Sequence, residues 1–442
     1  MRIAWLTPFD SGGGIPRFSR AVVLALGAMD GVDVDLWHPR TASPLDPHRL
    51  AAKALPDSLD EATAALSGYD HVVYNLGNHT SNHAAIYDVS RRLPGVVVLH
   101  DTVMQGFFVG YADEVRRDPA LYLAMMRYVY GASSEHFAAE GLGPDRSPEW
   151  WAEAARRYPL VEPCLFGATA AVTHSGDGLA PVSRRYGSLL PATVLDLPSA
   201  VVDIDAAQRD AASRADLGVP TDRVLLLVAG RLGPSKRVEV VLRAIAAEPE
   251  LRDGAFLAVA GGGDAEHLAY LRRLARKLGI EPLVRFFADP NDRLMHSLIA
   301  AADICVTLRN PSTESASAVL TEQLHFGKAV VVTRIGLYDR LPNDVVLKTD
   351  PDDETASVSA ALVALAGDPV LRASYEQAAA AWAEAHVSPH AYAERLVAFL
   401  RTLPERGAAL ARVDKAASEL ADVATVDVRA RASAVAERLA NG

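Results

Sequence analysis

The residues with the clearest chemistry form the run Gly230-Arg231-Leu232-Gly233-Pro234-Ser235-Lys236-Arg237, which follows the apolar segment Val224–Ala229. Cations at the carboxyl end of a buried strand, just before a helix, lie where open α/β sheets bind ligands. One charge pair at about 4 Å contributes roughly 4 kcal/mol at an effective dielectric of 20, before desolvation costs. Arg231 and Lys236 therefore predict a site for a diphosphate, with a solvated basic turn as the alternative.

Two carboxylates follow a second apolar run, Ile304–Leu308: Glu314 lies in the predicted loop, and Glu322 lies in the helix after it. Their spacing allows both to face one cleft. A carboxylate accepts paired, charge-assisted hydrogen bonds from sugar or ribose hydroxyls. The alternative is that both are ordinary surface charges.

A glycine loop, Ser11-Gly12-Gly13-Gly14, follows the first apolar run and precedes a helical pattern whose first turn holds Pro16. Glycines let backbone N–H groups approach a ligand closely, and a helix N-terminus favours an anion. The run is not a dinucleotide fingerprint, because Arg17 stands where the last glycine belongs. Glu266 breaks the same pattern after Gly261-Gly262-Gly263, so hydride transfer loses its main support. A tight βα turn is the alternative reading of the loop.

No metal site is predicted from the histidines and aspartates. His79 and His83 have a zinc-like spacing but lack an evident third ligand. Asp33-Val34-Asp35 alternates with apolar residues, which is typical of the exposed face of a strand. His100 and His174 each end an apolar run, where a structural role competes with a place in a cleft.

The elements that must position these residues are short β-branched runs alternating with helical patterns such as Val238–Ala247 and His267–Leu278. Several runs are apolar throughout, as parallel strands buried on both faces are. We therefore predict an α/β protein with two doubly wound, Rossmann-like domains facing across a cleft. The predicted strands are Ile3–Thr7, Val32–Trp37, Val72–Leu76, Val96–His100, Ala170–His174, Val194–Leu197, Val224–Ala229, Phe256–Ala260, Val284–Phe287, Ile304–Leu308, Ala329–Thr333 and Val345–Leu347.

The predicted domains are an N-terminal domain, a helical insertion rich in aromatics, a C-terminal domain, a helix that returns to the first domain, and a helical tail. Their respective ranges are 1–200, 107–163, 201–387, 388–404 and 405–442.

Composition narrows the function classes. The 44 Lys and Arg residues against 55 Asp and Glu give a net charge of −11, which argues against nucleic acid or anionic membranes as the main partner. Cys164 and Cys305 lie far apart in the sequence, so a disulfide scaffold is not expected. We therefore expect the protein in a reducing cytoplasm. No uncharged apolar run reaches the roughly 20 residues of a membrane helix. Peripheral membrane association stays open.

In their order and spacing, the motifs described above resemble those of the retaining family 4 glycosyltransferases of the GT-B fold, and the resemblance is strongest over 224–335. The matching segments are the pair Arg231 and Lys236, Gly261-Gly262-Gly263-Asp264, Val284-Arg285-Phe286-Phe287-Ala288, Ala301-Ala302-Asp303-Ile304, the motif Glu314-x7-Glu322, and Phe326-Gly327-Lys328-Ala329-Val330-Val331. Two departures concern the donor pocket: Ser315-Ala316-Ser317 replaces the usual Gly-Phe-Gly, and Ala288 replaces a frequent glycine.

The resemblance implies a role for each candidate residue. Arg231 and Lys236 would hold the donor diphosphate without a metal. Glu322 would bind the ribose, and Glu314 the donor sugar. The remaining donor contacts are the backbone at Ser317, Ala318 and Val319, the base-bordering Phe287, and the loop glycines Gly12, Gly13 and Gly14. His100 would lie against the donor sugar near the reaction centre.

The implied activity is retaining transfer of a sugar from a nucleoside diphosphate to a hydroxyl of a glycan, lipid-linked or small-molecule acceptor, with no cofactor or metal. Candidates near the acceptor are Asn78, His79, Trp150 and Trp151, although clustered aromatics also form the core of a helical subdomain. The tail 405–442 is a candidate segment for homo-oligomerisation. The competing functions are a sugar-nucleotide epimerase, a phosphorylase, and a non-catalytic protein that binds glycans or nucleotide sugars.

Overall fold

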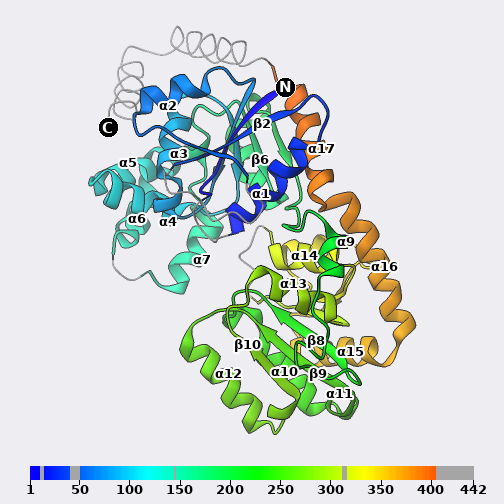
Figure 1. The fold of residues 1–442 in the computed structure, drawn as a ribbon. Helices are drawn as coiled ribbons and strands as arrows, with labels where there is room; N and C mark the ends of the chain where they lie inside the picture. The colour runs from blue at the N-terminus through cyan, green and yellow to red at the C-terminus, as the bar shows by residue number, and fades with distance from the viewer. Residues whose placement is uncertain (10–13, 40–49, 144–145, 311–315, 405–442) are drawn as a thin grey trace. The chain divides into compact units, whose positions relative to one another are not determined.

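The computed structural model describes residues 1–9, 14–39, 50–143, 146–310 and 316–404. The chain divides into two compact units, one of Met1–Asp196 with the segment from Ala393 onward, and one of Leu197–Tyr392. Each unit is built on one parallel sheet flanked by helices (Figure 1). The predicted tail 405–442 and the residues Gly12, Gly13 and Glu314 lie outside the described residues.

The sheet of the first unit has seven parallel strands in the order β3-β2-β1-β4-β5-β6-β7. The strand order reverses between β1 and β4, so the switch point of this doubly wound sheet lies between these two strands. Its strands are β1 (Arg2–Leu6), β2 (Asp33–His38), β3 (Ala52–Ala54), β4 (His71–Leu76), β5 (Val96–Leu99), β6 (Ala170–Thr173) and β7 (Ala192–Val194). Its covering helices are α1 (Gly14–Gly27), α2 (Leu59–Leu66), α3 (Thr80–Arg92) and α8 (Gly176–Tyr186).

A helical insertion lies between β5 and β6. It consists of α4 (Gln105–Gly110), a π-helical turn (Tyr111–Val115), α5 (Pro119–Tyr130), α6 (Glu135–Gly141) and α7 (Pro148–Arg157). Its Gln105 is fully buried, and the side-chain amide donates to the Tyr158 carbonyl (2.6 Å) and accepts from the Tyr122 hydroxyl (2.6 Å). The buried aromatic residues of the insertion thus extend the core of the first sheet, and the polar group of Gln105 inside that core is paired.

The sheet of the second unit has six parallel strands in the order β10-β9-β8-β11-β12-β13, with the switch point between β8 and β11. Its strands are β8 (Val224–Ala229), β9 (Ala255–Ala260), β10 (Val284–Phe287), β11 (Ile304–Thr307), β12 (Ala329–Thr333) and β13 (Leu347–Thr349). The α-helices that follow β7 in the described chain are α9 (Ile204–Arg209), α10 (Val238–Ala247), α11 (Pro249–Gly254), α12 (Ala265–Lys277), α13 (Asp292–Ala301), α14 (Ala318–His325), α15 (Glu354–Gly367), α16 (Pro369–His386) and α17 (Pro389–Thr402).

Strand β8 shows why the predicted runs are apolar throughout. Leu226 and Val228 belong to one buried cluster, whereas Leu225 and Leu227 belong to another. Successive side chains of a strand point to opposite faces of the sheet, so both faces of β8 are covered by helices.

All twelve predicted strands overlap a strand of the structure. Two of them, Val194–Leu197 and Val345–Leu347, are displaced along the chain, and one strand of the structure, β3, was not predicted. The ends β7 and β13 start and stop where their neighbours β6 and β12 offer partners, and Val345 and Val346 are buried without joining the sheet. Strand β3 is a three-residue edge strand, Ala-Lys-Ala, that has no apolar pattern to reveal it.

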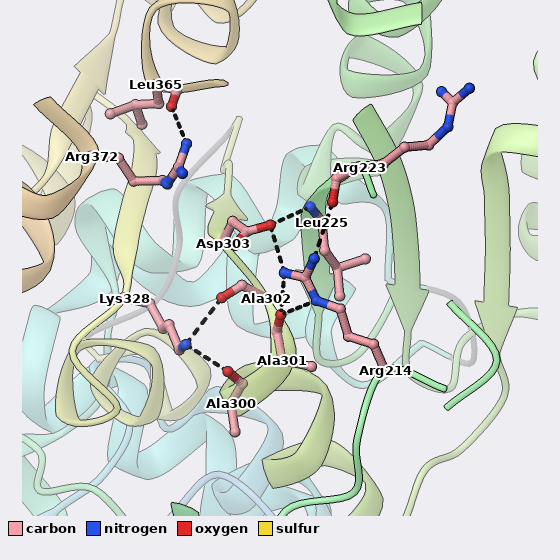
Figure 2. A network of polar contacts seen from close by, with 10 residues as sticks. All are labelled: Arg214, Arg223, Leu225, Ala300, Ala301, Ala302, Asp303, Lys328, Leu365 and Arg372. Carbon is pink, nitrogen blue, oxygen red and sulfur yellow. Dashed lines mark hydrogen bonds and ion pairs between the residues drawn. The ribbon is translucent and has the colours of Figure 1, made fainter. Parts of the chain in front are cut away.

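A polar network fixes the amino-terminal side of β11 (Figure 2). Asp303 accepts from the Leu225 N–H (2.7 Å) and from Arg214 (2.6 Å), and the Arg214 guanidinium also donates to the Ala301 carbonyl. The Lys328 ammonium donates to the Ala300 and Ala302 carbonyls, which closes the C-terminus of α13. Asp303 and Lys328, two residues of the matching segments, thus hold the framework at the edge opposite the carboxyl ends of the strands.

No single helix in the described part of the chain is both long and apolar enough to cross a membrane; α15 taken with Pro369–Thr402 passes that test only as a pair bent by 99°.

Candidate functional site

The carboxyl end of β8 is built on glycine backbone. The Gly230 N–H donates to the Ala260 carbonyl (2.9 Å), and the Leu232 N–H donates to the Gly262 carbonyl (2.7 Å). A Cβ atom on Gly261, whose φ is +152°, would lie 1.8 Å from the Gly230 carbonyl oxygen. The Gly261–Gly263 turn therefore supports the loop that carries Arg231, and its glycines are needed for this close approach.

Lys236 lies at the second sheet's switch point and is only 3% exposed. Its ammonium donates to the Ala229 carbonyl at 2.7 Å. A Cβ atom on Gly230 would lie 3.1 Å from the Lys236 Nζ atom and 2.9 Å from a methyl of Val319. The Asn310 N–H donates to the Ser235 carbonyl (2.9 Å). The ends of β8 and β11 and the first turn of α14 therefore meet around Lys236.

The other two cations of this run differ in their surroundings. Arg231 is exposed. Arg237 forms ion pairs with Glu354 and Glu239, each at 2.6 Å. Hydrogen bonding to Glu354 raises the pKa of Arg237. Arg237 therefore belongs to the framework, because its charge is already matched by two carboxylates.

Helix α14 begins beside Lys236. Its N-cap Ser317 is buried, has extended backbone, and makes no side-chain capping bond; Ala318 and Val319 form the first turn. The N-terminus of a helix carries partial positive charge and N–H groups that favour an anion. Further along, Glu322 is 1% exposed and lies 3.9 Å from the His296 Nε2 atom.

Phe287 ends β10 at the same edge of the sheet. Its carbonyl accepts from the Gly261 N–H at 2.9 Å, and the Arg285 guanidinium lies 5.3 Å from its ring centre. The structure thus brings Phe287, Arg231, Lys236 and the first turn of α14 to the carboxyl edge of one sheet. Glu322, the remaining predicted donor residue of this unit within the described chain, lies further along α14.

In the first unit, Asn75 lies at the centre of the switch point and is fully buried in β4. Its amide nitrogen donates to the Leu6 carbonyl (2.9 Å), and its amide oxygen lies 3.0 Å from the His100 Nε2 atom. Its backbone carbonyl lies 3.0 Å from the His83 Nδ1 atom. Sequence reasoning overlooked Asn75, although a polar residue inside the apolar run Val72–Leu76 is a signal in itself.

The rings of His100 and His174 face each other within hydrogen-bonding distance. The His174 Nε2 atom lies 3.1 Å from the His100 Nδ1 atom, and the His174 Nδ1 atom lies 3.0 Å from the Leu195 carbonyl oxygen. Phe18 of α1 packs edge-on against both rings, at 4.7 Å and 5.4 Å between centroids. Both histidines therefore have fixed rings, and His174 does more than end a strand.

Burial keeps the histidines of this cluster neutral at pH 7. It lowers the pKa of His83 and of His174 to about 4. Desolvation, followed by the neighbouring His174 and His83, lowers the pKa of His100 well below its usual value. No ring here is a standing cation under ordinary conditions.

The four candidate acceptor residues divide into two pairs. The side chain of Asn78 accepts from the Phe107 N–H (2.7 Å), and Trp150 is 6% exposed, stacked on Phe137 with its indole N–H bonded to the Phe137 carbonyl. His79 is exposed, and Trp151 is 36% exposed. Asn78 and Trp150 therefore serve the packing of the insertion, and His79 and Trp151 are the accessible members.

The described residues hold no group of three or more His, Cys, Asp and Glu side chains arranged to bind a metal ion. Gly14, the one glycine of the predicted loop that the structure describes, is the first residue of α1, and a Cβ atom there would meet nothing within 4 Å.

Part of the chain matches the model of a known protein family. Residues 210–382 match the model of the family described as glycosyl transferases group 1. Curated relatives include D-inositol 3-phosphate glycosyltransferase 2 of Catenulispora acidiphila, 37% identical over 164 residues, and D-inositol 3-phosphate glycosyltransferase of Streptomyces avermitilis, 35% identical over 187 residues. The matches cover 34% and 39% of this chain, which spans 38% and 39% of the length of these relatives.

Solved structures match over both units. Anabaena HepE in complex with UDP has a TM-score of 0.62 at 17% identity, covering 91% of this chain and 100% of HepE. WaaG, a glycosyltransferase involved in lipopolysaccharide biosynthesis, has a TM-score of 0.52 at 18% identity, with 91% and 100% covered. The two doubly wound sheets are those of the GT-B fold, as predicted from the sequence.

Proposed function

We propose that the protein transfers a sugar from a nucleoside diphosphate to an acceptor hydroxyl, because residues 210–382 match the model of the glycosyl transferases group 1 family. We further propose that the anomeric configuration is retained and that no metal takes part. The observation that carries the proposal is the meeting of Lys236, Arg231 and the N-terminus of α14 at one switch point.

These groups suit a diphosphate without help from a divalent ion. The Lys236 ammonium is buried and already oriented by the Ala229 carbonyl, so little reorganisation is needed when charge develops nearby. The N-terminus of α14 supplies backbone N–H groups to the same anion. HepE binds UDP in its crystals, and a nucleoside diphosphate sugar is the donor class we propose for this chain.

The remaining donor contacts follow the resemblance seen in the sequence. Glu322 would accept from the ribose hydroxyls, Phe287 would border the base, and His100 would lie against the sugar. Glu314, which falls outside the described residues, would contact the same sugar.

In the proposed reaction, the bond between the anomeric carbon and the diphosphate oxygen breaks as the acceptor oxygen bonds to that carbon from the same face. The acceptor proton passes to the departing phosphate oxygen. Arg231 and Lys236 stabilise the charge that gathers on the diphosphate, and stabilisation of this kind is often the largest single contribution to catalysis. We assign no nucleophile to the chain, so trapping of a covalent glycosyl-enzyme would contradict this mechanism.

The test begins with a thermal-shift panel of UDP-, GDP-, ADP- and TDP-sugars. A sugar nucleotide at 100 times its dissociation constant stabilises the folded state by about 2.7 kcal/mol. Melting points that stay fixed across the panel would remove the basis for the donor site.

Turnover of the donor that binds then separates the candidate activities. An epimerase releases an isomerised sugar nucleotide with no acceptor present. A phosphorylase requires inorganic phosphate, and a binding protein shows no turnover with any acceptor offered. Transfer to an acceptor, with the product anomer identified by NMR, supports the proposal.

Lys236→Met tests the central assignment. We expect kcat to fall on the order of a hundredfold or more, because one oriented donor to a developing anion is removed. Lys277→Met, at an exposed position on α12, is the matched control and should keep wild-type turnover. Near-normal activity of a folded Lys236→Met protein would refute the role of Lys236.

A further inference from the structure

The first unit contains a chain of three hydrogen-bonding contacts that crosses the carboxyl edge of its sheet. It runs from the Leu195 carbonyl through both nitrogens of His174 and both nitrogens of His100 to the side-chain oxygen of Asn75. The orientation of the Asn75 amide is fixed, because its other end faces the Leu6 carbonyl, which only accepts.

Counting protons along this chain gives an unusual result. Both ends are carbonyl oxygens, so the His174 Nδ1 atom and the His100 Nε2 atom must each carry a proton. The middle contact, between the His100 Nδ1 atom and the His174 Nε2 atom, needs a third proton. Two neutral imidazoles hold two protons, so the neutral pair satisfies two contacts, and one added proton satisfies all three.

Burial acts against that third proton. His174 is 5% exposed, and the Phe18 ring covers one side of both imidazoles. Among the titratable groups around the pair, His83 on α3 lowers the pKa of His100, and Asp101 follows His100 in the sequence. The His83 Nδ1 atom lies within hydrogen-bonding distance of the Asn75 carbonyl, and the Asp101 carboxylate accepts from the Asn78 N–H (2.7 Å). Both side chains are therefore held in the same framework.

We propose that His174 is a positioning residue for His100, and that the two rings share one titrating proton as a single unit. The positioning role rests on the proposed function, in which His100 lies against the donor sugar. With Asn75 and His174 as partners of both ring nitrogens, His100 presents a ring of fixed orientation to the sugar, and His174 acts on the reaction through that ring.

The shared proton can be tested by a titration that requires no activity assay. The full chain is labelled with ¹⁵N in the histidine imidazoles, and the ring nitrogens are followed by NMR from pH 8 to pH 3. We expect the His100 and His174 signals to move together with one midpoint, on the acid side of an exposed histidine. His136→Gln, an exposed histidine on α6, is the control and should leave both signals unchanged. Different midpoints for the two rings would overturn the shared proton. A His100 midpoint that is unchanged in the His174→Gln protein would overturn it as well.

The positioning role is tested by kinetics with two substitutions. His174→Leu removes the partner of the His100 Nδ1 atom, and we expect kcat to fall by about ten- to a hundredfold with the donor KM within about twofold. His174→Gln keeps an amide beside His100 and should recover most of the loss. Equal kcat for the wild type and a folded His174→Leu protein would refute the positioning role. Absence of transfer by the wild type would refute the proposed function, while the NMR result would still decide whether the rings share a proton.

Discussion

Replacing Gly261 by alanine should test how the second sheet supports its candidate site. Gly261 is the first residue of the glycine turn after β9 and has φ at +152°, a conformation that residues with a side chain rarely adopt. The added Cβ atom would lie 1.8 Å from the Gly230 carbonyl oxygen. That oxygen belongs to the backbone, so the loop that carries Arg231 must move.

The cost follows from two contributions. Holding a residue with a Cβ atom in this region of φ/ψ costs about 1–3 kcal/mol. Displacing the Gly230 loop strains its hydrogen bonds to Ala260 and Gly262, each worth about 1 kcal/mol. We therefore expect a loss of about 3–5 kcal/mol. For a unit spanning Leu197–Tyr392, each 1 kcal/mol shifts the melting temperature by about 2–4 °C, so the shift is on the order of 10 °C.

Differential scanning calorimetry of the full chain measures this shift, and Gly254→Ala is the matched control. A Cβ atom on Gly254 meets nothing within 4 Å, and this glycine ends α11 without a positive φ. Its replacement should leave the melting temperature unchanged or slightly raised, since alanine favours helix. A Gly261→Ala protein that melts with the wild type would show that the Gly230 loop does not depend on the glycine turn.

Two further predictions concern the framework of each unit. The pKa of His83 is about 4 in the folded chain and about 6.5 when exposed, so the unfolded chain binds the proton first as the pH falls; this stability is complete above about pH 6.5 and about 2 kcal/mol of it is lost by pH 5. Urea unfolding at pH 7.5 and pH 5 should show a smaller difference for His83→Asn than for the wild type, and an equal difference would contradict the assignment. Asp303→Ala should cost about 1–3 kcal/mol, because the Leu225 N–H and Arg214 lose their acceptor. Glu281→Gln, which breaks an exposed pair with Arg276, should cost less than about 1 kcal/mol in the same urea assay.

The fold could be predicted because the central strands of its sheets are buried on both faces. A run such as Val224–Ala229 has to be apolar at every position when helices cover the sheet on both sides, so the pattern identifies the strand and its parallel sheet together. Strand β3 lacks this constraint: Ala52–Ala54 lies at the edge of the sheet and is mostly exposed. Its pairing is decided by β2, which no local pattern reveals.

The candidate site could be predicted only in part, because residue type does not reveal the partner. Arg237 and Lys236 are adjacent cations, yet Arg237 is matched by Glu354, which is 117 residues away in sequence. Asn75 stood unremarked inside an apolar run, although its side chain and backbone link β1, His83 and His100. Contacts at such sequence distances depend on the order of strands in the sheet, and local spacing carries no record of them.

The distribution of partners also changes the meaning of the acidic composition. A net charge of −11 disfavours anions at long range, so a diphosphate must be held by local groups. Arg214 and Arg237 are committed to carboxylates, and Lys328 to the carbonyls that end α13. The proposed site therefore depends on Arg231, Lys236 and the α14 N-terminus. If Arg231 contributes mainly through its charge at an exposed position, Arg231→Gln should weaken donor binding most at low salt, while Lys236→Met should weaken catalysis at any salt concentration.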